Sequence, residues 1–307
     1  MSDEPMVVVG VGLTGESGFV IEKVASLAGD PDRIIAVHVM EHGYLYVEDE
    51  TEGLVRELGQ SFEELANSVE KDAHERLARV CKRFGVRNYQ LCSGHVATEL
   101  QRVADEHDAI AVAIGTHGRR GWRALLGETA NSVLHGTRTN VLAVYTPDEL
   151  PEVTSSYRRI LVAADLTRET DEVLAEAMRI RERFDAELYL MSVVRPLAQV
   201  YHGLDFSNAV EASVFETEAQ TRYERHLEKY ADGFGIDASR TIVRQGDPIS
   251  EIHATLDELD ADLLVLGTHG THGPALLLGS TSNSVLHGIR CDVMAVRVGK
   301  SETGGAV

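Results

Sequence analysis

The sequence predicts an α/β protein made of two tandem doubly wound domains, each with a five-stranded parallel sheet. The chain has 307 residues, and at about 150 residues per domain that length corresponds to two domains. Residues 94–144 align with residues 246–296 without a gap, with about half of the positions identical. In each copy, continuous apolar runs alternate with segments of helical spacing, which is typical of a parallel sheet covered on both faces.

The repeat also predicts the domain boundaries. The openings of the two copies correspond, as VVVGVGLTGES and ILVAADLTRET. The segment from Thr146 to Tyr157 carries prolines and no hydrophobic periodicity, so we interpret it as the linker. The first domain is therefore expected at residues 1–146 and the second at residues 158–300.

Apolar runs and helical spacing predict the elements of each copy. In the second copy the expected strands are Ile160–Ala164, Leu188–Val194, Thr241–Arg244, Leu263–Leu266 and Val293–Val298. The expected helices are one around Val173–Met178, a long surface helix from about Asn208 to Phe234, and one that Pro248 opens. The first copy repeats this order, with a helix beginning near Ser61, where Ser61 and Glu64 match a capping box. Ligands of such sheets bind at the carboxyl ends of the strands, where the strand order reverses.

Composition excludes several classes of function. A net charge of −20 without a basic stripe disfavours binding to nucleic acid. No apolar stretch is long enough for a membrane span, and MSDEPMVVVG lacks the basic region of a signal peptide, so we expect a cytoplasmic protein. The cysteines Cys81, Cys92 and Cys291 form no C-x-x-C pair and are odd in number, which indicates reduced buried thiols.

The segment after the fourth strand of the second copy carries the chemistry. It reads GTHGTHGPALLLGSTSNSV from Gly267 to Val285, and its glycines allow backbone N–H groups to approach a phosphate. A helix is expected to start at Gly279-Ser280 and to end near Gly288, a left-handed cap. Free N–H groups and hydroxyls at this helix start predict an anion site.

These residues resemble the motif of the universal stress protein family, which carries Gly-x-x-Gly, nine residues and then Gly-Ser on this loop. The resemblance covers both halves and implies a Rossmann-like fold similar to that of the adenine nucleotide alpha hydrolases. It implies that the loop glycines and the Gly-Ser pair hold the ribose and phosphates of ATP, and that an Asp after the first strand and main chain after the second hold the adenine. The matching site residues are Ala163, Asp165, Val193, Leu266, Gly267, His269, Gly270, Gly279, Ser280, Thr281 and Ser282.

The resemblance implies a function as well as a site. The ligand would be ATP, or ADP or AMP, with Mg²⁺ as a candidate companion ion. The role would be nucleotide-linked signalling in stress response, with at most slow hydrolysis, because no dedicated base or metal carboxylates are evident. The two halves would pair as an internal pseudo-dimer through their last strands, here Asn140–Tyr145 and Val293–Val298, and two chains would form a homodimer.

The first copy departs from the motif at two key positions. Glu128 stands where the second copy has Ser280, and Gly12 stands where it has Asp165. We therefore expect the first half to keep the fold and to have lost nucleotide binding. In both copies eight residues, one fewer than in the family, separate the last two motif glycines, such as Gly270 and Gly279.

Other interpretations remain open. Gly10–Gly15 spells G-x-G-x-x-G after a strand and Glu41 follows the second strand, which together would fit an NAD-dependent enzyme. The spacing to Glu41 is longer than usual and the second copy lacks these glycines, so we favour a loop without a dinucleotide. A ligand-free interaction scaffold is the third class. His269 and His272 form H-x-x-H, but without an evident third ligand we expect no metal.

Overall fold

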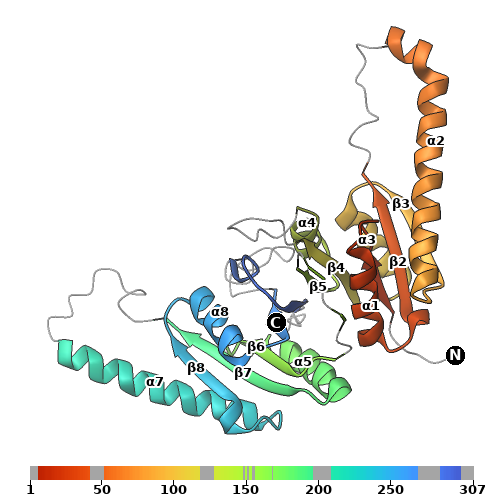
Figure 1. Cartoon of the computed structure of the whole chain (residues 1–307). Helices are drawn as coiled ribbons and strands as arrows, with labels where there is room; N and C mark the ends of the chain where they lie inside the picture. Colours follow the sequence, from red (N-terminus) through yellow and green to blue (C-terminus); the bar gives the residue numbers. More distant parts are fainter. Residues whose placement is uncertain are drawn as a thin grey trace, which may run out of the picture. The chain divides into compact units, whose positions relative to one another are not determined.

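A computed structural model describes most of the chain in two compact units (Figure 1). The first unit holds the described residues between 6 and 153, and the second holds those between 156 and 298. The described residues are 6–41, 52–117, 128–147, 149–150, 152–153, 156–167, 169–195, 209–268 and 284–298. Within them, the backbone alone is described for residues 52–65, 117, 128, 209–216 and 219.

The first unit alternates strands and helices in chain order. Its elements are β1 (Val7–Gly10), α1 (Ser17–Ala28), the 3₁₀ turn η1 (Pro31–Arg33), β2 (Ile34–Met40), α2 (Glu52–Arg83), β3 (Asn88–Ser93), α3 (Val96–Glu106), β4 (Ala111–His117), α4 (Glu128–Gly136) and β5 (Asn140–Thr146). The strands form a parallel sheet in the order β3-β2-β1-β4-β5. The order reverses between β1 and β4, because β2 and β4 flank β1 on opposite sides.

The second unit repeats this order. Its elements are β6 (Arg159–Ala163), α5 (Thr170–Phe184), β7 (Glu187–Val194), α7 (Ala209–Asp232), the 3₁₀ turn η3 (Ala238–Arg240), β8 (Thr241–Gln245), α8 (Pro248–Leu259), β9 (Leu263–Gly267) and β10 (Asp292–Val296). The strands lie parallel in the order β8-β7-β6-β9-β10, with the reversal between β6 and β9. The prediction of an α/β fold with doubly wound parallel sheets is confirmed.

The central strands are buried because helices cover both faces of each sheet. In the first unit Val8, Val9, Val112 and Ala113 are fully buried. Right-handed crossovers place α1 and α2 on one face and α3 and α4 on the other, and α3 packs against α4. None of the helices in the described ranges combines the length and the apolar character that a membrane span needs.

The loop after the first strand has a left-handed residue at the same place in both units. Leu13 and Leu166 occupy equivalent positions, and their φ angles are 53° and 58°. A left-handed conformation costs a non-glycine residue roughly 1–2 kcal/mol. Each loop is closed by a hydrogen bond to the neighbouring strand, from Val11 N–H to the Val37 carbonyl and from Ala164 N–H to the Met191 carbonyl.

One helix start needs correction, and one helix end is confirmed. The helix expected to begin near Ser61 begins at Glu52 instead, so the match of Ser61 and Glu64 to a capping box lies inside α2. The residues before Ser61 include Leu54, Arg56 and Leu58, all good helix formers that extend the helix towards its N-terminus. The prediction of a left-handed residue at Gly288 is confirmed by its φ of 87°.

Both ends of the expected linker belong to the folded units. Thr146 is the last residue of β5, and its side chain is buried. Tyr157 is buried before β6; its hydroxyl donates a hydrogen bond of 2.7 Å to the carboxylate of Asp292, and its ring meets that of Phe184 edge-on. Burial raises the pKa of Tyr157 well above its usual value, and the negative charge of Asp292 raises it further. Tyr157 is therefore part of the core of the second unit.

Replacing Tyr157 by Phe should destabilise the second unit. The ring would still fill its site, but Asp292 would lose a hydrogen bond to a charged group, which is worth roughly 1.5–3 kcal/mol. Urea unfolding followed by circular dichroism should show a lower free energy of unfolding by about that amount. Tyr189→Phe is the matched control, because its hydroxyl makes an exposed contact of 3.3 Å with Glu187. Equal stability of the two variants would contradict the role assigned to Tyr157.

Candidate functional site

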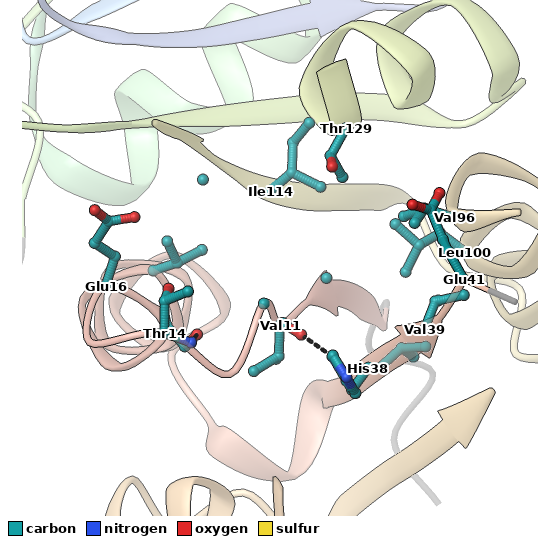
Figure 2. Close-up of a pocket in the computed structure, with 16 residues that line it drawn as sticks. Val11, Thr14, Glu16, His38, Val39, Glu41, Val96, Leu100, Ile114 and Thr129 are labelled. Carbon is teal, nitrogen blue, oxygen red and sulfur yellow. Dashed lines mark hydrogen bonds between the residues drawn. The ribbon is translucent and has the colours of Figure 1, made fainter. Parts of the chain in front are cut away.

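A pocket lies at the carboxyl ends of the strands of the first unit, where the strand order reverses (Figure 2). Its volume is about 320 Å³. Gly10 at the end of β1 and Ile114 on the neighbouring strand β4 both line it. This is the position at which doubly wound sheets bind their ligands. The structure thus shows a pocket in the half for which we expected nucleotide binding to be lost.

The pocket combines apolar walls with a few polar groups. Val39, Val96, Leu100 and Ile114 supply apolar surface, whereas Glu16 and Glu41 lie at opposite sides (Figure 2). Such a combination of apolar walls and sparse polar groups is typical of small-molecule sites, and the volume falls at the small end of their range.

His38 fixes the loop that forms one wall of this pocket. Its ring nitrogen Nδ1 lies 2.7 Å from the carbonyl oxygen of Val11 (Figure 2). Since a carbonyl oxygen can only accept, Nδ1 carries the proton and donates. A residue of β2 thereby holds the loop between β1 and α1 in place.

Ser192 has the same role in the second unit. Register places Ser192 of β7 where β2 has His38, because Gly10 pairs with Val37 and Ala163 pairs with Met191. The Ser192 hydroxyl donates a hydrogen bond of 2.7 Å to the carbonyl of Ala164, and it lies 3.0 Å from the hydroxyl of Tyr223 on α7. The loop that leads to Asp165 is therefore held by Ser192 of β7, which Tyr223 of α7 contacts in turn.

The structure brings together the described members of the predicted C-terminal site. Ala163 pairs with Leu266 across β6 and β9, and Gly267 follows at the end of β9. Val193 lies near the end of β7, on the other side of β6. Asp165 lies exposed two residues after β6. The remaining predicted residues lie outside the described ranges: His269, Gly270, Gly279, Ser280, Thr281 and Ser282.

Asp165 makes local hydrogen bonds. Its carboxylate accepts one of 3.2 Å from the backbone N–H of Thr167 and one of 2.8 Å from the Thr167 hydroxyl. The carboxylate therefore closes the turn before α5, while its exposure leaves its remaining acceptor capacity available to a ligand.

Gly267 and its counterpart Gly115 have a packing role that the sequence did not reveal. A Cβ atom on Gly115 would lie 3.0 Å from Cγ2 of Val20, and one on Gly267 would lie 3.2 Å from Cγ2 of Val173. Glycine at these strand ends lets the first helix of each unit pack closely against the sheet. The contact repeats in both units, so it does not depend on which half binds a ligand.

Counterparts of the predicted C-terminal site residues line the N-terminal pocket. Equivalent to Ala163, Asp165, Val193, Leu266, Gly267 and Thr281 are Gly10, Gly12, Val39, Ile114, Gly115 and Thr129, all of which line it. The sequence analysis expected the first half to have lost nucleotide binding and did not predict the pocket that this half forms at its strand ends. The apolar counterparts were visible in the repeat and were the available signal.

The two units differ in charge next to the site. The N–H of Gly94 donates to the carbonyl of Met40, and that of Gly246 donates to the carbonyl of Val194, so the next residues, Glu41 and Arg195, are equivalent. Hydrogen bonds from Ser250 lower the pKa of the nearby Asp247, and the positive charge of Arg195 lowers it further. A carboxylate in the first unit thus corresponds to a guanidinium in the second.

The geometry of Gly10–Gly15 differs from that of a dinucleotide fingerprint. In that motif the third glycine allows close packing between helix and strand, but a Cβ atom on Gly15 would meet nothing within 4 Å. Glu16 occupies the N-cap position of α1 and lines the pocket. A carboxylate at the helix start opposes the binding of a pyrophosphate there. These observations disfavour the NAD interpretation.

Comparisons with known proteins agree with the repeat. The model of the Universal stress protein family matches residues 6–145 and 156–297. Universal stress protein A homolog 2 of Coxiella burnetii is 36% identical over 144 residues, which cover 47% of this chain and 97% of that protein. Universal stress protein A homolog 1 of the same organism is 31% identical over 140 residues, which cover 46% of this chain and 96% of that protein.

A solved structure matches across both halves. The crystal structure of a universal stress protein from Archaeoglobus fulgidus superposes with a TM-score of 0.60 at 20% identity. The match covers 96% of this chain and 97% of that one. At this identity the likeness supports the fold.

Replacing Ser192 by Ala should loosen the loop that carries Asp165. The carbonyl of Ala164 would lose its side-chain donor, so the second unit should lose about 1 kcal/mol of stability. Amide hydrogen exchange should become faster at residues 164–167 and stay unchanged at residues 11–14, which His38 holds. Ser192→Thr keeps a hydroxyl and should restore slow exchange. Unchanged exchange at residues 164–167 in Ser192→Ala would contradict this role.

Proposed function

The chain belongs to the universal stress protein family, and we propose that its C-terminal half binds ATP or a related adenine nucleotide and links that binding to stress signalling. The observation that carries the proposal is the difference between the copies. The second copy has Asp165 after its first strand and Ser280 after the last motif glycine, where the first copy has Gly12 and Glu128. The residues suited to the two ends of a nucleotide thus occur together in one half.

Charge supports the same assignment. Arg195 follows β7 in the second unit, where the first unit has Glu41. A guanidinium beside the strand ends favours an anionic ligand, because it attracts phosphates and donates hydrogen bonds to them. Mg²⁺ would accompany the phosphates of ATP.

We propose a binding role with at most slow hydrolysis. Catalysis of phosphoryl transfer requires a base or a positioned water together with stabilisation of the transferred group, and the motif residues supply only contacts to the nucleotide. Conformational change on binding would then act on a protein partner. We further propose that the two halves pair through their last strands as an internal pseudo-dimer, and that two chains form a homodimer.

Isothermal titration should show about one ATP bound per chain, because only the second half has Ser280 and Asp165 where the first half has Glu128 and Gly12. NAD should bind no more tightly than adenosine, since the loop at Gly10–Gly15 lacks the geometry for a pyrophosphate. Two equivalent ATP sites would show that the first half had been misjudged. A crystal with a pyrophosphate over Gly12 would overturn the assignment against NAD.

Replacing Ser280 by Glu should separate phosphate binding from the rest of the site. The change copies Glu128 of the first half into the second, loses a hydroxyl contact and adds a negative charge. Loss of a hydrogen bond to a charged group alone should weaken ATP about 10- to 150-fold. Adenosine carries no phosphate, so its affinity should change little.

The reciprocal Glu128→Ser variant is the control, because it leaves the second half unchanged. Its C-terminal site should keep the affinity of the wild-type protein for ATP. If Ser280→Glu weakened ATP and adenosine equally, the pocket would have collapsed. If ATP were not weakened at all, the phosphates would lie elsewhere than at the Gly279-Ser280 helix start.

A further inference from the structure

The pocket of the first unit has no role in the proposed function. It lies entirely within that unit, and its volume of about 320 Å³ is sufficient for a small planar ligand. Val11, Val39, Leu100 and Ile114 give it apolar surface against which a flat ring can pack. Gly12 adds to this space, because a Cβ atom there would lie 3.8 Å from the nearest side-chain atom, Oγ1 of Thr14.

The two places that would ordinarily hold a phosphate carry acidic residues. Glu16 is the N-cap residue of α1, and α4 begins at Glu128. Glu169 holds the place of Glu16 in the second unit, so the difference between the units lies at Glu128 and Glu41. Negative charge at helix starts weakens the attraction of those helix ends for an anion.

Glu41 affects which chemical groups of a ligand the pocket favours. It lines the pocket directly after β2, at the place that Arg195 holds in the second unit. A carboxylate accepts hydrogen bonds from hydroxyl and amino groups and repels phosphates. In other doubly wound folds an acid after the second strand binds the hydroxyls of a ribose.

We propose that this pocket binds a nucleoside without phosphates, with its flat base between the apolar walls and its hydroxyls donating to Glu41. The proposal is independent of nucleotide binding in the second half. Three positive charges, at Arg119, Arg120 and Arg123, precede Glu128 in the sequence, outside the described residues. Because positive charges attract phosphates, a direct comparison of a nucleoside with its phosphorylated forms decides the specificity.

Ligand binding to this pocket can be measured separately from the second unit through the methyl group of Ile114. Its counterpart in the second unit is Leu266, so a protein labelled only at isoleucine methyl groups reports on the first pocket through Ile114. Adenosine, AMP and ATP should be titrated separately against the full chain. Adenosine should shift the Ile114 signal. Its affinity for the pocket should exceed that of ATP on the order of tenfold or more.

Substitution of Glu41 tests the specificity. Glu41 is exposed, so Glu41→Arg should leave the fold intact while it weakens adenosine and strengthens ATP, each on the order of tenfold. Glu41→Gln keeps the shape and should weaken adenosine less. Glu22→Gln, on the exposed part of α1, is the matched control and should change neither affinity.

Three results would overturn the proposal: an Ile114 signal that adenosine does not shift, ATP affinity at this pocket equal to that of adenosine, or a Glu41→Arg variant with unchanged preference. Failure of the proposed function would look different. In that case ATP would not bind the second half, as measured by calorimetry on wild type and Ser280→Glu, while adenosine would still shift Ile114.

Discussion

The reversal of strand order beside the first strand of each unit is the constraint on which the site depends. A parallel sheet covered on both faces needs crossover connections, and right-handed crossovers in opposite directions put neighbouring loops on opposite faces of the sheet. The loops after β1 and β4 therefore separate and leave a crevice between them. The N-terminal pocket lies at this place, lined by Gly10 of β1 and Ile114 of β4 among others.

Because the domain is duplicated, each half of the chain can be compared with the other. The loop conformation at Leu13 and Leu166, the contact of Gly115 and Gly267 with the first helix, and the hydrogen bond from the second strand to the first loop all occur in both units. The side chains around the crevice differ, and Glu41 and Arg195 differ in charge. Two copies of one scaffold thus present opposite charges at Glu41 and Arg195, and this is the physical basis for assigning them different ligands.

Much of the fold was predictable from the sequence because buried parallel strands read as continuous apolar runs. The strand at Leu263–Gly267 is an example, since its apolar run is bounded by Asp262 and the glycine loop. The start of α2 was missed because a capping-box pattern at Ser61 and Glu64 also fits the interior of a helix. The close approach of Val173 to Gly267 was not predictable, because a motif shows that glycine is present and not which neighbour requires it.

The arrangement of the strand ends was predictable from the sequence, and the pocket of the first half was not. The strand ends that carry Ala163, Val193 and Gly267 follow from the topology alone. The degenerate motif of the first copy led to the expectation of a lost nucleotide site, whereas a pocket depends on the apolar residues between the motif positions. Those residues, Val39 and Ile114 among them, still line a pocket.

The burial of Tyr157 shows that the repeated module and the folding module have different edges. Sequence similarity between the copies becomes visible at the first strand, near Ile160, but the core of the second unit already includes Tyr157 through its contacts with Asp292 and Phe184. A fragment that started at residue 158 would contain the whole motif and yet lack an aromatic ring from its core. Limited proteolysis or domain exchange between family members should therefore place the junction before Ser156.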